Sequence, residues 1–158
     1  MLDKETFCAR TVALQDTLFR TARSILRSDE DAEDAVQEAI CAAFAHRDRL
    51  RDPESFKPWL LRILANQCYD VCRGRRPAVD LAEVQEFLPA EGTDPTEGIT
   101  LWQAVLSLPA EQRTVVTLFY YESLSVREIS GILKISEGAV KTRLSRARAR
   151  LRELLREE

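Results

Sequence analysis

A stretch without a single basic residue divides this 158-residue chain and restricts its possible folds. Residues 77–100, PAVDLAEVQEFLPAEGTDPTEGIT, hold six acidic side chains and concentrate proline, glycine and threonine. Such a composition is typical of a linker rather than of a packed element. The segments on either side are each long enough for only a small domain. We therefore expect two units, residues 1–76 and 98–158, joined by an acidic flexible linker over residues 77–97.

Helical periodicity dominates the first unit. Apolar residues recur every three or four positions in LQDTLFRTARSIL, in DAEDAVQEAICAAF and in FKPWLLRILANQCYDVCR, which predicts three helices with buried stripes. Ser28 and Asp31 have the spacing of a capping box at the start of the second helix. We expect Trp59 in the core, and the RGRRP sequence ends the third helix. The predicted structure of residues 1–76 is a helical bundle.

The second unit shows the pattern of a helix-turn-helix. LWQAVLSL and PAEQRTVVTLFYYES predict two helices, each with one apolar face that includes Leu101 in the first. Ser125 and Glu128 form a second capping-box pattern at the start of a short helix. Ser136 is a suitable N-cap for the last helix. Two short helices joined by a tight turn, with a basic second helix, are typical of DNA-binding proteins.

The last helix is basic although the chain as a whole carries a net charge of −3. No acidic residue occurs between positions 138 and 152, although a solvated helix face normally alternates acids and bases. A helical wheel places an apolar seam on one side, made of Val140, Leu144, Ala147, Leu151, Leu154 and Leu155. Small residues, Thr142, Ser145 and Ala149, lie opposite the seam between two basic edges. This pattern suits insertion into the major groove and favours DNA binding over a solvated face.

The residue patterns give little support for an enzyme, a metalloprotein or a membrane protein. The sequence contains no nucleophile–base pairing, glycine-rich phosphate loop or HExxH motif, so we expect neither catalysis nor a cofactor. The four cysteines and His46 match no zinc signature, and we interpret the cysteines as free thiols that behave as small buried hydrophobes. The chain lacks an apolar run of membrane-spanning length and a signal pattern, so we expect a cytoplasmic protein.

Taken in order, the motifs resemble those of extracytoplasmic-function sigma factors of bacteria. DAEDAVQEAICAAF resembles the family's D-x-E-D-x-x-Q-E-x-F pattern, with Phe44 displaced. FKPWLLRILANQCYDVCRGRRP resembles the part of region 2 that reads the −10 promoter element. The segment from LPAEQRTVV to SRARARL resembles region 4. The resemblance implies an all-α fold of a region 2 bundle and a region 4 helix-turn-helix, and a transcription initiation factor that works with core RNA polymerase under an anti-sigma factor.

The resemblance also assigns roles to individual residues. Region 2 would contact the clamp helices of core polymerase through Asp34, Gln37 and Glu38. Asn66 matches an asparagine used near a flipped-out base of the −10 element, and an amide offers such a base both a donor and an acceptor. The loop with Arg73, Arg75 and Arg76 would contact the opened strand. Region 4 would read the −35 element with Lys141, Thr142, Ser145 and Arg146, while Arg143, Arg148 and Arg150 would contact phosphates.

Two positions depart from the family pattern. Ala139 replaces a threonine ahead of the recognition helix, and Lys134 occupies a turn position that glycine often holds. If Lys134 has a positive φ, its side chain costs on the order of 1 kcal/mol. Two other functions are considered: a DNA-binding regulator that does not engage polymerase, and a sigma mimic that captures anti-sigma factors. The regulator would not need the acidic face of the first unit, and the decoy would not need a cationic recognition helix.

Overall fold

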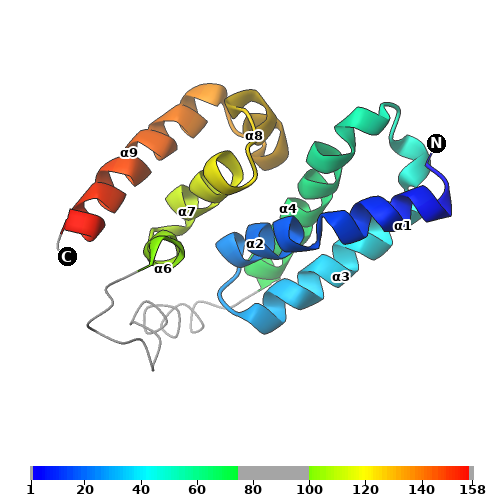
Figure 1. Cartoon of the computed structure of the whole chain (residues 1–158), viewed down its shortest axis with the longest axis horizontal. Helices are drawn as coiled ribbons and strands as arrows, with labels where there is room; N and C mark the ends of the chain where they lie inside the picture. The colour runs from blue at the N-terminus through cyan, green and yellow to red at the C-terminus, as the bar shows by residue number, and fades with distance from the viewer. Residues whose placement is uncertain (1, 75–99, 157–158) are drawn as a thin grey trace.

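The computed structural model describes residues 2–74 and 100–156. All regular structure in these two ranges is helical, which confirms the predicted all-α fold. Arg75, Arg76 and the predicted linker at 77–97 lie outside the described residues. Figure 1 shows the helices of the first range, coloured blue to green, beside those of the second range, coloured yellow-green to red.

Region 2 is built from four α-helices: α1 (Lys4–Ala13), α2 (Gln15–Ile25), α3 (Asp29–Ala45) and α4 (Phe56–Gly74). Two short 3₁₀ turns, η1 (Arg47–Arg49) and η2 (Pro53–Ser55), connect α3 to α4. The predicted cap is confirmed, since the Ser28 hydroxyl accepts a hydrogen bond from the Asp31 amide at 3.1 Å. Helix α1 was not predicted from the sequence, and it begins where Asp3 caps the Thr6 amide at 2.7 Å.

Small and aromatic side chains together close the region 2 core. Ala32, Ala35, Ala39 and Ala43 line the buried side of α3, and α3 and α4 pack side by side. Alanine side chains are short, so two helices can approach each other closely along such a stripe. Next to Ala43, the ring of Phe7 contacts Phe44 and Phe56 edge-on, at centroid distances of 5.3 and 5.7 Å.

Region 4 is built from α6 (Leu101–Leu106), α7 (Ala110–Val116), a π-helical turn η3 (Thr117–Tyr121), α8 (Val126–Leu133) and α9 (Glu137–Arg156). Ser125 and Glu128 form the predicted capping box at α8, with both hydrogen bonds at 3.0 Å. Ser136 caps α9 as predicted by accepting a hydrogen bond from the Ala139 amide at 3.0 Å. Serine caps therefore fix the starts of both helices of the helix-turn-helix.

Three burial predictions were wrong. Leu101 and Leu155, expected in the core, are 54% and 39% exposed, because they line an open groove between α6 and α9 instead of packing into the core. The fully buried part of the α9 seam ends at Ala147. The cysteines are free thiols as predicted, but only Cys68 is buried, whereas Cys8, Cys41 and Cys72 are exposed.

Region 2 and region 4 share one continuous cluster of buried apolar residues, which runs from Leu2 to Ala147. Between the two regions, α2 packs against α7 and α4 packs against α8 (Figure 1). Trp59 lies at the border of this cluster and is only partly buried. The structure therefore shows the two regions packed against each other.

Candidate nucleic-acid and polymerase interfaces

The helix-turn-helix holds the N-terminal end of α9 in a fixed position. Ile129 and Ile132 of α8 and Val140 and Leu144 of α9 are buried. Lys134 adopts the left-handed conformation, with φ 59° and ψ 43°, and ends α8. The Ser130 hydroxyl donates a hydrogen bond of 2.5 Å to the Ile135 carbonyl, which closes the turn. This packing leaves the side of α9 opposite the buried seam available to a partner.

The four residues expected to read the −35 element share that available side of α9. Lys141, Thr142, Ser145 and Arg146 are all exposed. Thr142 and Ser145 lie opposite Val140 and Leu144 on the helix, and Lys141 and Arg146 flank them on either side. Their side chains offer hydroxyl donors and acceptors between two cations, which suits contact with base edges flanked by phosphates. The structure agrees with the helical wheel that Thr142 and Ser145 lie opposite the seam with cations beside them.

The three arginines expected to contact phosphates have different neighbours in the structure. Arg143 is partly buried and lines a pocket with Tyr69 of region 2. Arg148 donates a hydrogen bond of 3.1 Å from Nη1 to the Tyr120 hydroxyl. Arg150 lines a separate depression with Arg27. The structure therefore does not gather these three arginines on one surface.

Helix α4 carries the side chains expected at the −10 element. Asn66 is partly exposed at the middle of α4, and Arg73 is exposed near its end, where it pairs with Asp70. Burial raises the pKa of Tyr69, one turn after Asn66, while the nearby charge of Arg143 opposes this shift. Burial also raises the pKa of the Cys68 thiol to about 12. The part of α4 that is expected to bind the −10 element therefore lies against region 4.

Asp34, Gln37 and Glu38, the residues expected to contact core polymerase, form an exposed acidic face on α3. They lie opposite the buried alanines of the same helix, so their position follows from helical periodicity. None of the three takes part in an ion pair within the described ranges. The carboxylates and the amide are therefore free to contact a basic partner surface.

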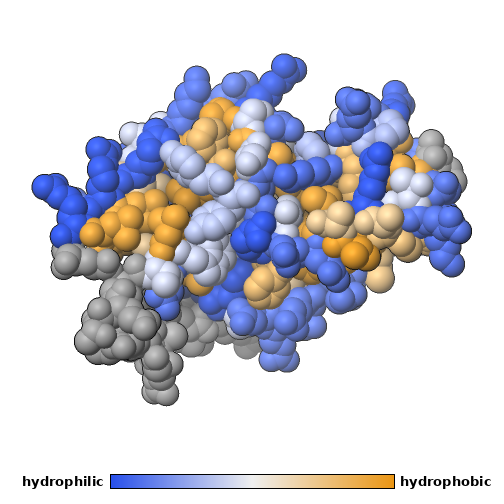
Figure 2. All heavy atoms as spheres, in the orientation of Figure 1, coloured by the Kyte–Doolittle hydropathy of each residue, from blue (hydrophilic) through white to orange (hydrophobic). Residues whose placement is uncertain are grey.

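An apolar groove between α6, η3 and α9 was not predicted from the sequence. Leu101, Val116, Tyr120 and Leu155 are among the residues that line its volume of about 710 Å³. Three of these side chains are the most exposed large apolar groups of region 4 as described, at 54% for Leu101, 50% for Tyr120 and 39% for Leu155. Figure 2 shows apolar surface at this end of α9, bordered by hydrophilic side chains.

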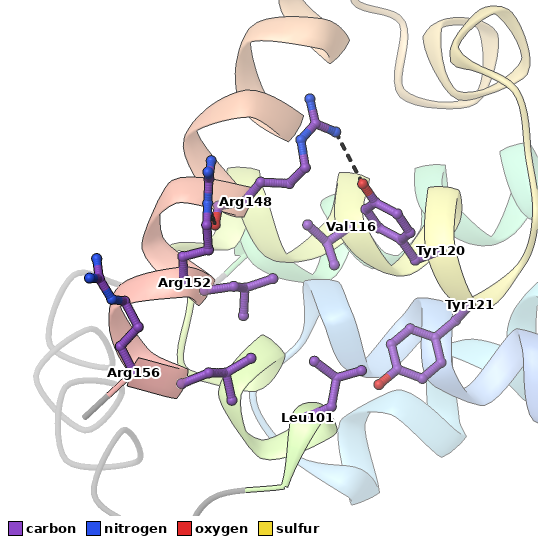
Figure 3. Close-up of a pocket in the computed structure, with 9 residues that line it drawn as sticks. Leu101, Val116, Tyr120, Tyr121, Arg148, Arg152 and Arg156 are labelled. Atoms are coloured by element: carbon purple, nitrogen blue, oxygen red, sulfur yellow. Dashed lines mark hydrogen bonds between the residues drawn. The ribbon is translucent and has the colours of Figure 1, made fainter. Parts of the chain in front are cut away.

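Three arginines form the basic edge of this apolar groove. Arg148, Arg152 and Arg156 follow one another along α9 (Figure 3), one helical turn apart. The sequence signal for the groove was available, because leucines and arginines alternate at the end of α9. We expected these leucines to form a buried seam, but α6 has only six residues and leaves the groove open.

A second feature that was not predicted is an arginine-lined cleft between regions 2 and 4. Arg49, Arg51 and Arg62 line it from region 2, together with Trp59, and Arg127 lines it from α8. The cleft has a volume of about 590 Å³. The three arginines of region 2 could have been noticed as a cluster, since they lie in or close to the break RDRLRDPES between two helices. Arg127 could not, because it comes from the other region.

Comparison with known proteins supports the assignment by sequence. The family description "Sigma-70 region 2" matches residues 12–77, and "Sigma-70, region 4" matches residues 99–151. The ECF RNA polymerase sigma factor SigM of Mycobacterium tuberculosis is 37% identical over 140 residues, covering 87% of this chain and 71% of SigM. The chain belongs to the extracytoplasmic-function sigma factor family. SigW of Bacillus subtilis is 33% identical over 171 residues, covering 98% of this chain and 91% of SigW.

Two solved structures show the same arrangement of helices. The sigma factor RpoE in complex with the anti-sigma factor NepR from Bartonella quintana has a TM-score of 0.73 and 28% identity. The match covers 95% of this chain and 96% of RpoE. CnrH in complex with the cytosolic domain of CnrY has a TM-score of 0.68 and 28% identity, covering 99% of this chain and 91% of CnrH. Both proteins were solved in complex with a partner protein.

Metal and membrane features are not found in the residues that the structure describes. No group of three or more His, Cys, Asp or Glu side chains among them is arranged to hold a metal ion. None of the helices in the two described ranges is long and apolar enough to cross a bilayer.

Proposed function

We propose that this chain directs core RNA polymerase to promoters through two reading surfaces and one docking surface. The observation that carries the proposal is the exposed face of α9, where Lys141, Thr142, Ser145 and Arg146 lie together on a helix that the turn holds in place. This face would read the −35 element in the major groove. Asn66 and the arginines that follow it would bind the opened −10 strand.

The acidic face of α3 would dock region 2 on core polymerase. Asp34 and Glu38 are exposed and have no ion-pair partner in the described ranges, so they would meet a basic surface at little desolvation cost. The similarity to RpoE, which was solved with an anti-sigma factor, supports control of this chain by a protein of that class. Such a protein would prevent initiation by covering the surfaces that polymerase needs.

Run-off transcription with purified core polymerase tests this function. The template would be a library of randomised promoters, so that the active sequences report the −10 and −35 preferences. We expect transcripts only when the protein is added, and at least a tenfold loss with Asn66→Ala or Arg146→Ala. Arg156→Ala is the control for Arg146, since it removes the same charge from the groove side of α9.

The docking step needs its own measurement. Asp34→Asn combined with Glu38→Gln should weaken binding to core polymerase without changing the affinity for duplex DNA. Glu5→Gln is the matched control, because Glu5 is an exposed acidic residue on α1, outside the acidic face of α3. Duplex binding without core binding would favour a plain DNA-binding regulator. Anti-sigma binding without either activity would favour a decoy.

A further inference from the structure

One arginine of α9 is oriented by an uncharged partner. The Arg148 guanidinium donates a hydrogen bond of 3.1 Å from Nη1 to the Tyr120 hydroxyl of η3, and Figure 3 shows the two side chains turned toward each other. Arg23 and Arg73 instead pair with carboxylates, which compensate their charge. A phenol oxygen orients a guanidinium without neutralising it, so Arg148 keeps its full positive charge in a defined direction.

The turn that carries Tyr120 keeps this side chain at the surface. Tyr120 is 50% exposed although it is a large aromatic residue. Its ring contacts the Phe119 ring edge-on, at a centroid distance of 4.9 Å, and both residues belong to the π-helical turn η3. Turns of this kind are rare and are often found at functional sites. The Tyr120 hydroxyl can therefore hold Arg148 while the guanidinium stays open to a ligand.

Arg148 continues an edge of α9 that begins beside the reading face. Lys141 and Arg148 lie about 20° apart around the helix and about 10 Å apart along it. In a helix-turn-helix, the N-terminal residues of the recognition helix contact the bases in the major groove. A cation two turns farther along the same edge therefore meets the wall of that groove, which consists of phosphates. Arg143 and Arg150, expected in the same role, line pockets together with residues of region 2.

The surroundings of Arg148 leave its charge for an anion from outside the chain. Within the described ranges no carboxylate pairs with Arg148. The residues that line the adjacent groove include three arginines and no acid, and the sequence has no acid between positions 138 and 152. Glu122, which follows η3, is buried and accepts two hydrogen bonds from Arg20. A phosphate is the anion that a duplex would offer at this position.

We propose that Tyr120 is a positioning residue, which orients Arg148 to bind one backbone phosphate of the −35 duplex. The inference rests on the proposed function and deepens it, because it adds a residue of η3, outside the helix-turn-helix, to the DNA interface. An arginine that is held before binding loses less side-chain entropy in the complex. Phosphate contacts fix the register of a protein on DNA and carry no sequence information, so the pair contributes to affinity rather than to promoter preference.

A double-mutant cycle tests whether the two residues act as one unit. Tyr120→Phe removes the hydroxyl and keeps the ring, and we expect about fivefold weaker duplex binding, against about tenfold for Arg148→Ala. The double variant should bind as weakly as Arg148→Ala alone, because the hydroxyl acts only through the arginine. Tyr121→Phe is the matched control, since it removes a hydroxyl from the same turn, and Figure 3 shows that side chain pointing toward Leu101.

Salt titrations separate orientation from charge. Arg148→Ala removes a cation, so the slope of log affinity against log salt should fall by about one unit. Tyr120→Phe leaves that cation in place, so the slope should stay as in wild type although the affinity falls. Thermal unfolding and circular dichroism should be unchanged for both variants, because both side chains are exposed.

Duplexes with a single neutral phosphate identify the contact itself. The probe is a −35 duplex obtained from the run-off library, with a methylphosphonate in place of one phosphate at a time. At one position, the neutral group should weaken wild-type binding about tenfold. The same duplex should bind Arg148→Ala as well as the unmodified duplex does, and Tyr120→Phe should show a smaller loss than wild type.

The outcomes separate the positioning role from the proposed function. If Tyr120→Phe binds the duplex as tightly as wild type, or if its loss multiplies with that of Arg148→Ala, the positioning role is refuted. The proposed function then still stands, provided that Arg146→Ala weakens binding. Variants that bind DNA normally but bind core polymerase less well would show that the pair contacts a protein, which also refutes the proposal. If wild type gives no transcripts with core polymerase, the proposed function is wrong and the positioning role fails with it.

Discussion

The conformation of Lys134 gives a prediction whose size follows from the backbone. Lys134 ends α8 in the left-handed region, with φ 59° and ψ 43°. This conformation costs an L-residue with a β-carbon about 1–2 kcal/mol, and glycine avoids the cost. Glycine also gives the unfolded chain more freedom, which offsets about 0.4–1 kcal/mol of the gain. We therefore expect Lys134→Gly to raise the free energy of unfolding by about 0.5–1 kcal/mol.

The measurement is thermal and urea unfolding of matched variants. For a chain of this size, the expected gain shifts the midpoint of thermal unfolding by roughly 1–4 °C. Lys134→Ala is the essential control, since it removes the charge and the long side chain but keeps the β-carbon in the same strained backbone. The Lys134 side chain is exposed, so neither variant loses core packing. If alanine stabilises as much as glycine, the cause is charge or side-chain entropy, and the strain argument fails.

Three further predictions concern the reading helix, the buried thiol and a helix cap. Arg146→Ala should lower the dependence of log affinity for duplex DNA on log salt by about one unit, while Arg156→Ala should leave it nearly unchanged in salt titrations. Because burial raises the pKa of Cys68 to about 12 from about 9, the free energy of unfolding should fall between these pH values, and Cys68→Ala should reduce that fall in urea unfolding. Ser125→Ala should cost about 1 kcal/mol in thermal unfolding, because the Glu128 amide loses its cap.

Local signals in the sequence were sufficient to predict most of the helices. Ser28, Ser125 and Ser136 were expected to start helices, and each accepts a hydrogen bond from the amide three residues later. Such interactions join residues close together in the chain, so they can be recognised without the fold. The same logic could have found α1, where Asp3 caps Thr6.

Burial was harder to predict, because it depends on which element lies opposite. The apolar pattern of α9 continues to Leu155, but the facing helix α6 has only six residues, from Leu101 to Leu106. Leu101 at its start and Leu155 near the end of α9 line an open groove instead of a core. Periodicity identifies which face of a helix is apolar, yet it gives no information on the length of the neighbour. The exposed acidic face of α3 was predicted correctly because its opposite face packs along its whole length.

The contact between the two regions could not be predicted from the sequence. Across this contact Arg20 donates to the Glu122 carboxylate, and Arg113 donates to the Ser24 carbonyl. Arginine and glutamate are the residue types expected on a solvated surface, and nothing in the sequence spacing indicates that Arg113 and Glu122 are buried. Their partners lie about 100 residues away, as with Arg20 and Glu122. Only the packing of α2 against α7 and η3 brings them together. Long-range polar pairs of this kind leave no periodic pattern to read.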